Sequence, residues 1–183
     1  GYIALFLDVL EPYVLNDKLS YIAPEVMAFF VEHCKATNGI VTVERCLLHM
    51  DCTIMDFDSI LTLLRTNNMY SALFYVFNQG LDDYIAPLEI LLDKVFDEAD
   101  AGGLSLVGTF QNDFERLGYK ALLYLQASFQ GKTFPQEKPM EPEERASSAR
   151  NEILKFLLQE SFAPSPHVKK VANFVPTVGQ RAL

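Results

Sequence analysis

The sequence lacks the long apolar runs and paired cysteines that mark several classes of protein. No stretch reaches the roughly 18 apolar residues that a membrane-spanning helix needs, and no basic-then-apolar secretory segment opens the chain. The cysteines, Cys34, Cys46 and Cys52, are odd in number, which suits free thiols in a reducing compartment better than a disulfide framework. We therefore expect a soluble intracellular protein with no transmembrane segment.

The sequence also lacks a surplus of basic residues. It has 15 lysines and arginines against 24 aspartates and glutamates, a formal net charge of -9. Proteins that bind nucleic acid neutralise its phosphates with a basic surface, so we expect no nucleic-acid partner. The acidic residues are concentrated between residues 82 and 100, where seven carboxylates accompany a single lysine.

Motifs that carry catalysis are missing as well. The sequence contains no Gly-x-Ser-x-Gly nucleophile motif, phosphate-binding loop, dinucleotide fingerprint or His-Glu-x-x-His zinc motif. The pair Asp82 and Asp83 precedes an expected helix, and helix capping explains it better than acid–base chemistry does. We predict no enzyme activity, no catalytic residue and no cofactor.

Two histidines and the three cysteines raise the alternative of a zinc site. These potential ligands are His33, Cys34, Cys46, His49 and Cys52. Structural zinc sites usually pair their ligands across a turn as Cys-x2-Cys or His-x3-His, whereas a free cysteine is ordinarily a small buried apolar residue. We favour buried thiols and predict no metal site.

Helical periodicity is what the sequence does contain. The expected helices cover residues 24–37, 41–49, 56–66, 69–78, 87–99, 112–130 and 142–159. Pro24 suits a first helical residue, Asp56 suits an N-cap whose carboxylate accepts from the next turn's amides, and Gly80 suits a helix end. Since no segment shows the two-residue alternation of half-buried strands, we predict an all-α fold.

The helical part is expected to cover residues 1–162. Within it, the three prolines and alternating charges of residues 131–142 predict an exposed linker. The pattern decays after Phe162, so residues 163–183 form a poorly defined tail with one possible short helix around His167–Phe174.

A short phrase recurs three times, as GYIALF, MYSALF and GYKALL, with its alanine at positions 4, 72 and 121. The first two alanines are 68 residues apart, twice the length of a two-helix repeat of about 34 residues, whereas the next separation of 49 residues is no multiple. A small alanine lets a neighbouring helix approach closely, and the flanking apolar side chains fill the space around it. The phrase favours an irregular α-solenoid of stacked antiparallel helix pairs, although chance recurrence remains an alternative.

The second phrase begins the most apolar of the expected helices. Tyr70, Leu73, Phe74 and Phe77 form one stripe on it, and little polar surface remains on its other sides. A helix that is apolar nearly all round must be covered nearly all round. We therefore expect this stripe at the centre of the core.

The chain resembles a known family over Val41–Leu92, which includes Leu-His-Met-Asp, Met-Tyr-x-Ala-Leu-x-Tyr-Val-x-Asn and Asp-Asp-Tyr-Ile-x-Pro-Leu. GYKALLYLQASFQGKTFP, residues 118–135, continues the likeness in the form of fungal members. The family is the vacuolar-protein-sorting subunit numbered eight of CORVET endosomal tethering complexes, in its central α-helical region.

The resemblance implies a non-enzymatic scaffold in vesicle tethering and fusion, peripheral on endosomal or vacuolar membranes. It also implies a long protein with a β-propeller before the solenoid and a zinc-binding RING-type domain after it. Other subunits of the complex are its implied partners, and contact with a Rab-family GTPase is expected outside this segment.

One helical surface offers an alternative function. Glu89, Asp93 and Asp97 recur one turn apart along an expected acidic ridge, opposite Leu88, Leu91, Leu92, Val95 and Phe96. Like charges at this spacing repel each other, and a basic partner would relieve the repulsion. The ridge is either a solvated surface or the site where a helical adaptor binds a basic or amphipathic peptide.

Overall fold

The structure is a computed structural model that describes residues 2–37, 39–100 and 113–158. The chain divides into two compact units, Gly1–Asp82 and Asp83–Leu183. The described residues form eight α-helices with two short helical turns of other types, and they contain no strand, only an isolated bridge between Lys132 and Pro139. The predicted all-α fold is confirmed. The predicted tail of residues 163–183 lies outside the described residues.

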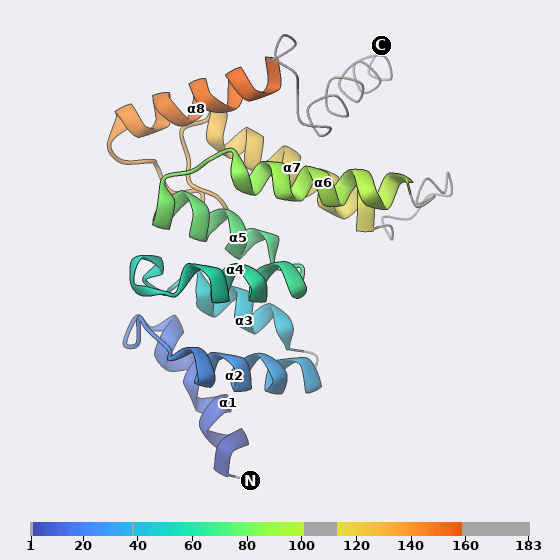
Figure 1. Ribbon diagram of the computed structural model, residues 1–183. Helices are drawn as coiled ribbons and strands as arrows, with labels where there is room; N and C mark the ends of the chain where they lie inside the picture. Colours follow the sequence, from blue (N-terminus) through green and yellow to red (C-terminus); the bar gives the residue numbers. More distant parts are fainter. Residues whose placement is uncertain (1, 38, 101–112, 159–183) are drawn as a thin grey trace. The chain divides into compact units, whose positions relative to one another are not determined.

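The first unit consists of helices that follow one another closely in sequence (Figure 1). They are α1 (Tyr2–Leu15), α2 (Pro24–Ala36), α3 (Ile40–Leu47), the 3-10 turn η1 (Cys52–Ile54), α4 (Phe57–Thr66), α5 (Tyr70–Val76) and the π-helical turn η2 (Phe77–Leu81). Helix α3 packs against both α1 and α5, while α2 packs on α1 and α3, and α4 packs on α5. Each helix thus buries one side against the next helices along the chain, as in a solenoid.

The predicted central stripe is confirmed as core. Leu73 and Phe74 have no exposed surface, and Tyr70 and Phe77 are also buried. The ring of Phe77 packs edge-on against that of Phe57, with centroids 5.2 Å apart. The alanine of the second repeated phrase, Ala72, is fully buried among them.

The helix ends follow the predicted punctuation with two differences. Helix α2 begins at Pro24 as predicted, and Asp56 precedes α4. However, the Asp56 carboxylate caps no backbone amide, because it accepts from the Ser59 hydroxyl instead. The apolar helix does not end at Gly80 either, since a π-helical turn carries it through Leu81 to Asp82, whose φ of 54° is left-handed.

A glutamate of α3 holds the start of α5. The residue before α5, Met69, supplies no side-chain cap. Instead, the backbone N–H groups of Ser71 and Ala72 donate to Oε1 of Glu44, at 2.8 and 3.1 Å. This carboxylate therefore caps a helix that begins 26 residues after it.

The second unit contains α6 (Ala86–Asp100), α7 (Asp113–Phe129) and α8 (Glu143–Leu158). Helix α7 packs against both α6 and α8. The side chain of Tyr124 on α7 is fully buried. Its hydroxyl donates to the Tyr84 carbonyl at 2.9 Å, and its ring packs edge-on against that of Phe134. Ala121, the alanine of the third phrase, is buried, while the side chain of Ala4 in the first phrase lies outside the described part.

The apolar side chains of α7 divide between the core and the surface. Leu122 is 58% exposed, whereas Tyr124 is fully buried. The aromatic ring fills more of the core, and the Tyr84 carbonyl satisfies its hydroxyl.

The segment predicted as an exposed linker, residues 131–142, folds back on itself. Glu137, Lys138 and Pro139 are exposed, but Phe134 and Met140 are buried. Backbone bonds close the turn, from the Thr133 N–H to the Lys138 carbonyl and from the Met140 N–H to the Gly131 carbonyl. The segment thus contributes to the core of its unit.

Candidate interaction surfaces

The acidic ridge of α6 is less exposed than its sequence suggests. Of Glu89, Asp93 and Asp97, only Asp97 is exposed, whereas the other two are half-buried. The opposite side of the helix buries Leu88, Leu91, Val95 and Phe96, as predicted, and leaves Leu92 half-buried. The three carboxylates thus lie along one helix, but neighbouring side chains cover part of the ridge.

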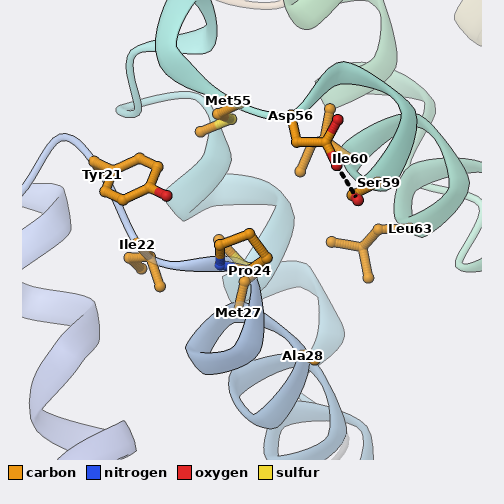
Figure 2. A pocket seen from close by; sticks show the side chains of 10 residues that line it. All are labelled: Tyr21, Ile22, Pro24, Met27, Ala28, Met55, Asp56, Ser59, Ile60 and Leu63. Carbon is orange, nitrogen blue, oxygen red and sulfur yellow. Dashed lines mark hydrogen bonds between the residues drawn. The ribbon is translucent and has the colours of Figure 1, made fainter.

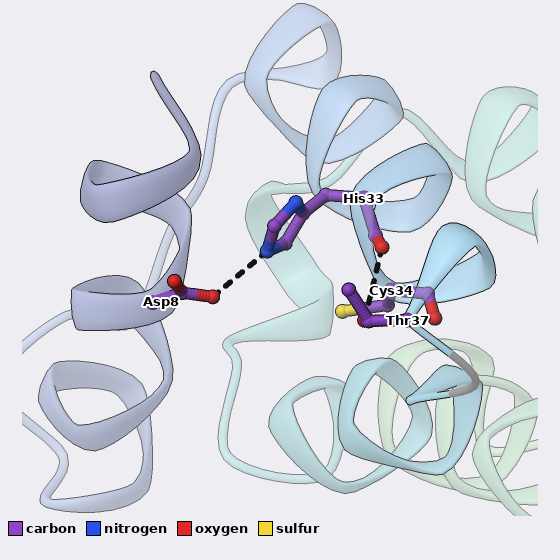
Figure 3. A network of polar contacts seen from close by, with 4 residues as sticks. All are labelled: Asp8, His33, Cys34 and Thr37. Carbon is purple, nitrogen blue, oxygen red and sulfur yellow. Dashed lines mark hydrogen bonds and ion pairs between the residues drawn. The ribbon is translucent and has the colours of Figure 1, made fainter. Parts of the chain in front are cut away.

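The potential zinc ligands are divided among other contacts. His33 Nε2 lies 2.8 Å from Asp8 Oδ1, while His49 Nδ1 lies 3.0 Å from Asp17 Oδ1 (Figure 3 shows the first pair). Cys34 and Cys46 are buried. Within the ranges that the structure describes, no group of three or more histidine, cysteine or acidic side chains could hold a metal ion.

The environment of the cysteines favours protonated thiols. Burial, with a smaller contribution from the Glu11 carboxylate, raises the pKa of Cys46 to about 12. Burial also raises the pKa of Cys52 to about 11 and that of Cys34 above its ordinary value. Since the thiolate is the nucleophile and the metal ligand, these side chains are poorly suited to either chemistry at neutral pH.

Helix α1 has one anchored side and one exposed apolar side. Asp8 pairs with His33 of α2, and Glu11 pairs with Arg45 of α3, next to the buried Leu10 and Val14. The exposed side carries Leu5, Phe6, Val9 and Tyr13, each about half exposed. Helix α1 thus presents an apolar surface on the side away from its ion pairs.

A groove lies between the N-terminal ends of α2 and α4 in the first unit. Its volume is about 240 Å³. The residues that line it are Tyr21, Ile22, Pro24, Met27, Ala28, Met55, Asp56, Ser59, Ile60 and Leu63. Figure 2 shows Tyr21 and Ile22 on one side, with Asp56, which precedes α4, and Ser59 of α4 across from them. We refer to this feature as the α2–α4 groove.

The loops before α2 and α4 hold the groove in shape. The Asp51 N–H donates to the Ser20 carbonyl at 3.0 Å, which ties the two loops together. The Asp51 carboxylate in turn accepts from the Thr53 hydroxyl and N–H, and these bonds lower its pKa below the ordinary value. Ile22, Met27 and Ile60 are buried, while Tyr21 is 42% exposed at the edge.

The sequence analysis did not predict this groove. Its two sides are separated by about 30 residues, and each lining residue taken alone is typical of a helix start or a core position. The polar residues Asp56 and Ser59 stand beside apolar residues in the sequence, and this pattern could have indicated a binding site. An ordinary helix N-terminus explains the same pattern equally well.

The chain is similar to proteins of known family. A family model described as the Vps8 central TPR matches residues 5–180. "Vacuolar protein sorting-associated protein 8 homolog" of Mus musculus is 29% identical over 174 residues, and the protein of the same name from Homo sapiens is 28% identical over 174 residues. Each of these alignments covers 95% of the chain and 12% of the relative.

A fungal relative is more distant. "Vacuolar protein sorting-associated protein 8" of Saccharomyces cerevisiae is 19% identical over 154 residues, which cover 84% of the chain and 12% of that protein. No solved structure matches the chain significantly. The chain thus spans about one eighth of the length of these relatives. Among the helices that the structure describes, none has the length and apolar character needed to cross a bilayer.

Proposed function

Since the chain belongs to the Vps8 central TPR family, we propose that it is a scaffold segment in a subunit of an endosomal tethering complex of the CORVET type. The proposed process is vesicle tethering and fusion, with protein sorting from endosomes to the vacuole. The full-length protein would be peripheral on endosomal or vacuolar membranes, and its partners would be other subunits of the complex. We place contact with a Rab-family GTPase outside this segment.

The observation that carries the proposal is the match to the family over residues 5–180, taken together with the core of the first unit. In that unit each helix is held by its neighbours along the chain, through buried side chains such as Phe74 and through the Glu44 cap of α5. Such an array can keep distant modules at a set separation without chemistry of its own. The buried thiol of Cys46, whose pKa burial raises to about 12, agrees with a role that uses no cysteine nucleophile.

The test is made in the full-length protein. Residues 2–158 are replaced by a flexible Gly/Ser-rich linker, which removes the helices but keeps the flanking regions on one chain. We expect loss of vacuolar delivery of a sorted hydrolase, with weaker co-purification of other tethering subunits. A matched control replaces the exposed Glu137 and Lys138 with serine. Normal sorting and assembly with the linker in place would contradict the scaffold proposal.

A further inference from the structure

We propose that the α2–α4 groove binds a short peptide segment of a partner protein that presents one or two apolar side chains beside a lysine or arginine. This site goes beyond the scaffold function, because it gives one surface of the first unit a ligand of defined chemistry. The size of the groove, its apolar lining and the acidic residues beside it suit such a ligand.

The volume of the groove suits side chains rather than a cofactor. At about 240 Å³ it is smaller than the roughly 300–1,000 Å³ of typical sites for small organic ligands. Its floor is apolar, with buried Ile22, Met27 and Ile60. Two lining methionines, Met27 and Met55, have flexible side chains that can adapt to branched or aromatic groups. An apolar anchor from a peptide would therefore find partners on several sides.

The charge around the groove selects a basic ligand. The two segments that supply the lining, residues 21–28 and 55–63, carry no basic residue and three exposed acidic residues: Glu25, Asp56 and Asp58. Lys18, which precedes the first segment, lies over the Tyr13 ring, 5.9 Å from its centroid. The surface therefore attracts a cationic peptide. It repels an anionic membrane, because binding to such a membrane would require basic residues on the protein.

Asp56 supplies the polar contact at the edge of the groove. An N-cap aspartate normally turns its carboxylate toward the amides of its own helix, but Asp56 does not. One of its oxygens accepts from the Ser59 hydroxyl, and both side chains line the groove (Figure 2). The carboxylate is exposed, so a lysine or arginine next to an apolar anchor can reach it.

The experiment pans a phage-displayed library of random dodecapeptides on the 183-residue chain and measures binding of the enriched peptides by fluorescence anisotropy. Two variants probe the groove. Ala28→Trp fills it from an exposed lining position, and Asp56→Asn removes the charge while keeping a residue that suits an N-cap. Asp97→Asn is the matched control, because it removes an exposed carboxylate from α6 in the other unit. Thermal unfolding of each variant establishes that it is folded.

We expect enriched peptides to combine apolar residues with lysine or arginine. Their Kd should rise at least tenfold with Ala28→Trp, about threefold to tenfold with Asp56→Asn, and not at all with Asp97→Asn. Rising salt should weaken binding to the native chain more than binding to Asp56→Asn.

Three outcomes of the peptide selection would overturn the proposal: enrichment of acidic peptides, no enrichment, or binding that a folded Ala28→Trp variant retains. The proposal would also be overturned if the native chain bound phosphatidylserine vesicles and Ala28→Trp abolished that binding, because the groove would then be a membrane-binding site. None of these results bears on the linker replacement, which tests the scaffold function separately.

Discussion

Removal of the Glu44 carboxylate should destabilise the first unit by detaching the start of α5. In the native chain Oε1 of Glu44 accepts from two backbone N–H groups, those of Ser71 and Ala72. Glu44→Ala leaves both amides without that acceptor at the beginning of a helix that has no cap from its own sequence. Because Glu44 is half-buried, water replaces the lost bonds only in part.

The magnitude follows from the contacts that are lost. Loss of an N-cap costs about 1 kcal/mol, and loss of a negative charge at a helix N-terminus costs about 0.5 kcal/mol. A poorly solvated amide left without a partner adds about 1 kcal/mol. We therefore expect Glu44→Ala to lower the free energy of unfolding by about 2–3 kcal/mol. Glu44→Gln keeps a neutral acceptor at the same place, so its cost should be about 1 kcal/mol.

The assay is urea unfolding followed by circular dichroism, with hydrogen exchange measured on peptides that cover residues 69–78. Glu44→Ala should lower the urea midpoint and speed exchange in these peptides more than in peptides from α7. Glu32→Ala is the matched control, because Glu32 is exposed and pairs with the nearby Lys35 of its own helix. Equal midpoints for Glu44→Ala and Glu32→Ala, or unchanged exchange at residues 69–78, would refute the capping role.

Three further predictions concern the core, the thiols and the acidic ridge. Phe74→Ala should lower stability by about 3–5 kcal/mol, because the side chain is fully buried, and a melting temperature near that of the native chain would contradict the packing. Cys46 should react with iodoacetamide at pH 8 about a hundredfold or more slowly in the folded than in the urea-unfolded chain, as mass spectrometry of the alkylated residue would show. Because burial raises its folded pKa to about 12, its contribution to stability is complete below about pH 9 and is lost as the pH rises toward 12, so the urea midpoint should fall over that window. Charge reversal of Glu89, Asp93 and Asp97 to lysine should weaken any basic partner bound along α6 by more than fivefold at low salt without loss of helix content, and retained binding would eliminate the ridge as a docking surface.

Local features of the sequence predicted most of the helices well. Pro24 begins α2 as expected, and the stripe from Tyr70 to Phe77 is buried as its composition required. These predictions succeeded because a helix start and an apolar stripe depend on residues within one or two turns. On α7 the same periodicity places Tyr124 on the side of the buried Leu117 and Ala121, whereas Leu122, two positions before Tyr124, points to the other side and is exposed.

The sequence by itself determined the all-helical fold, the buried aromatic centre and, through extended likeness, the family. The tertiary structure alone decided which distant groups meet. It brings Glu44 to the start of α5 and buries Phe134, which lies in a segment predicted to be a linker. It also places the residues around the starts of α2 and α4 together, where they form the α2–α4 groove. The physical reason is that helical periodicity is a property of neighbouring residues, whereas a cap or a groove formed by another helix depends on how the helices pack.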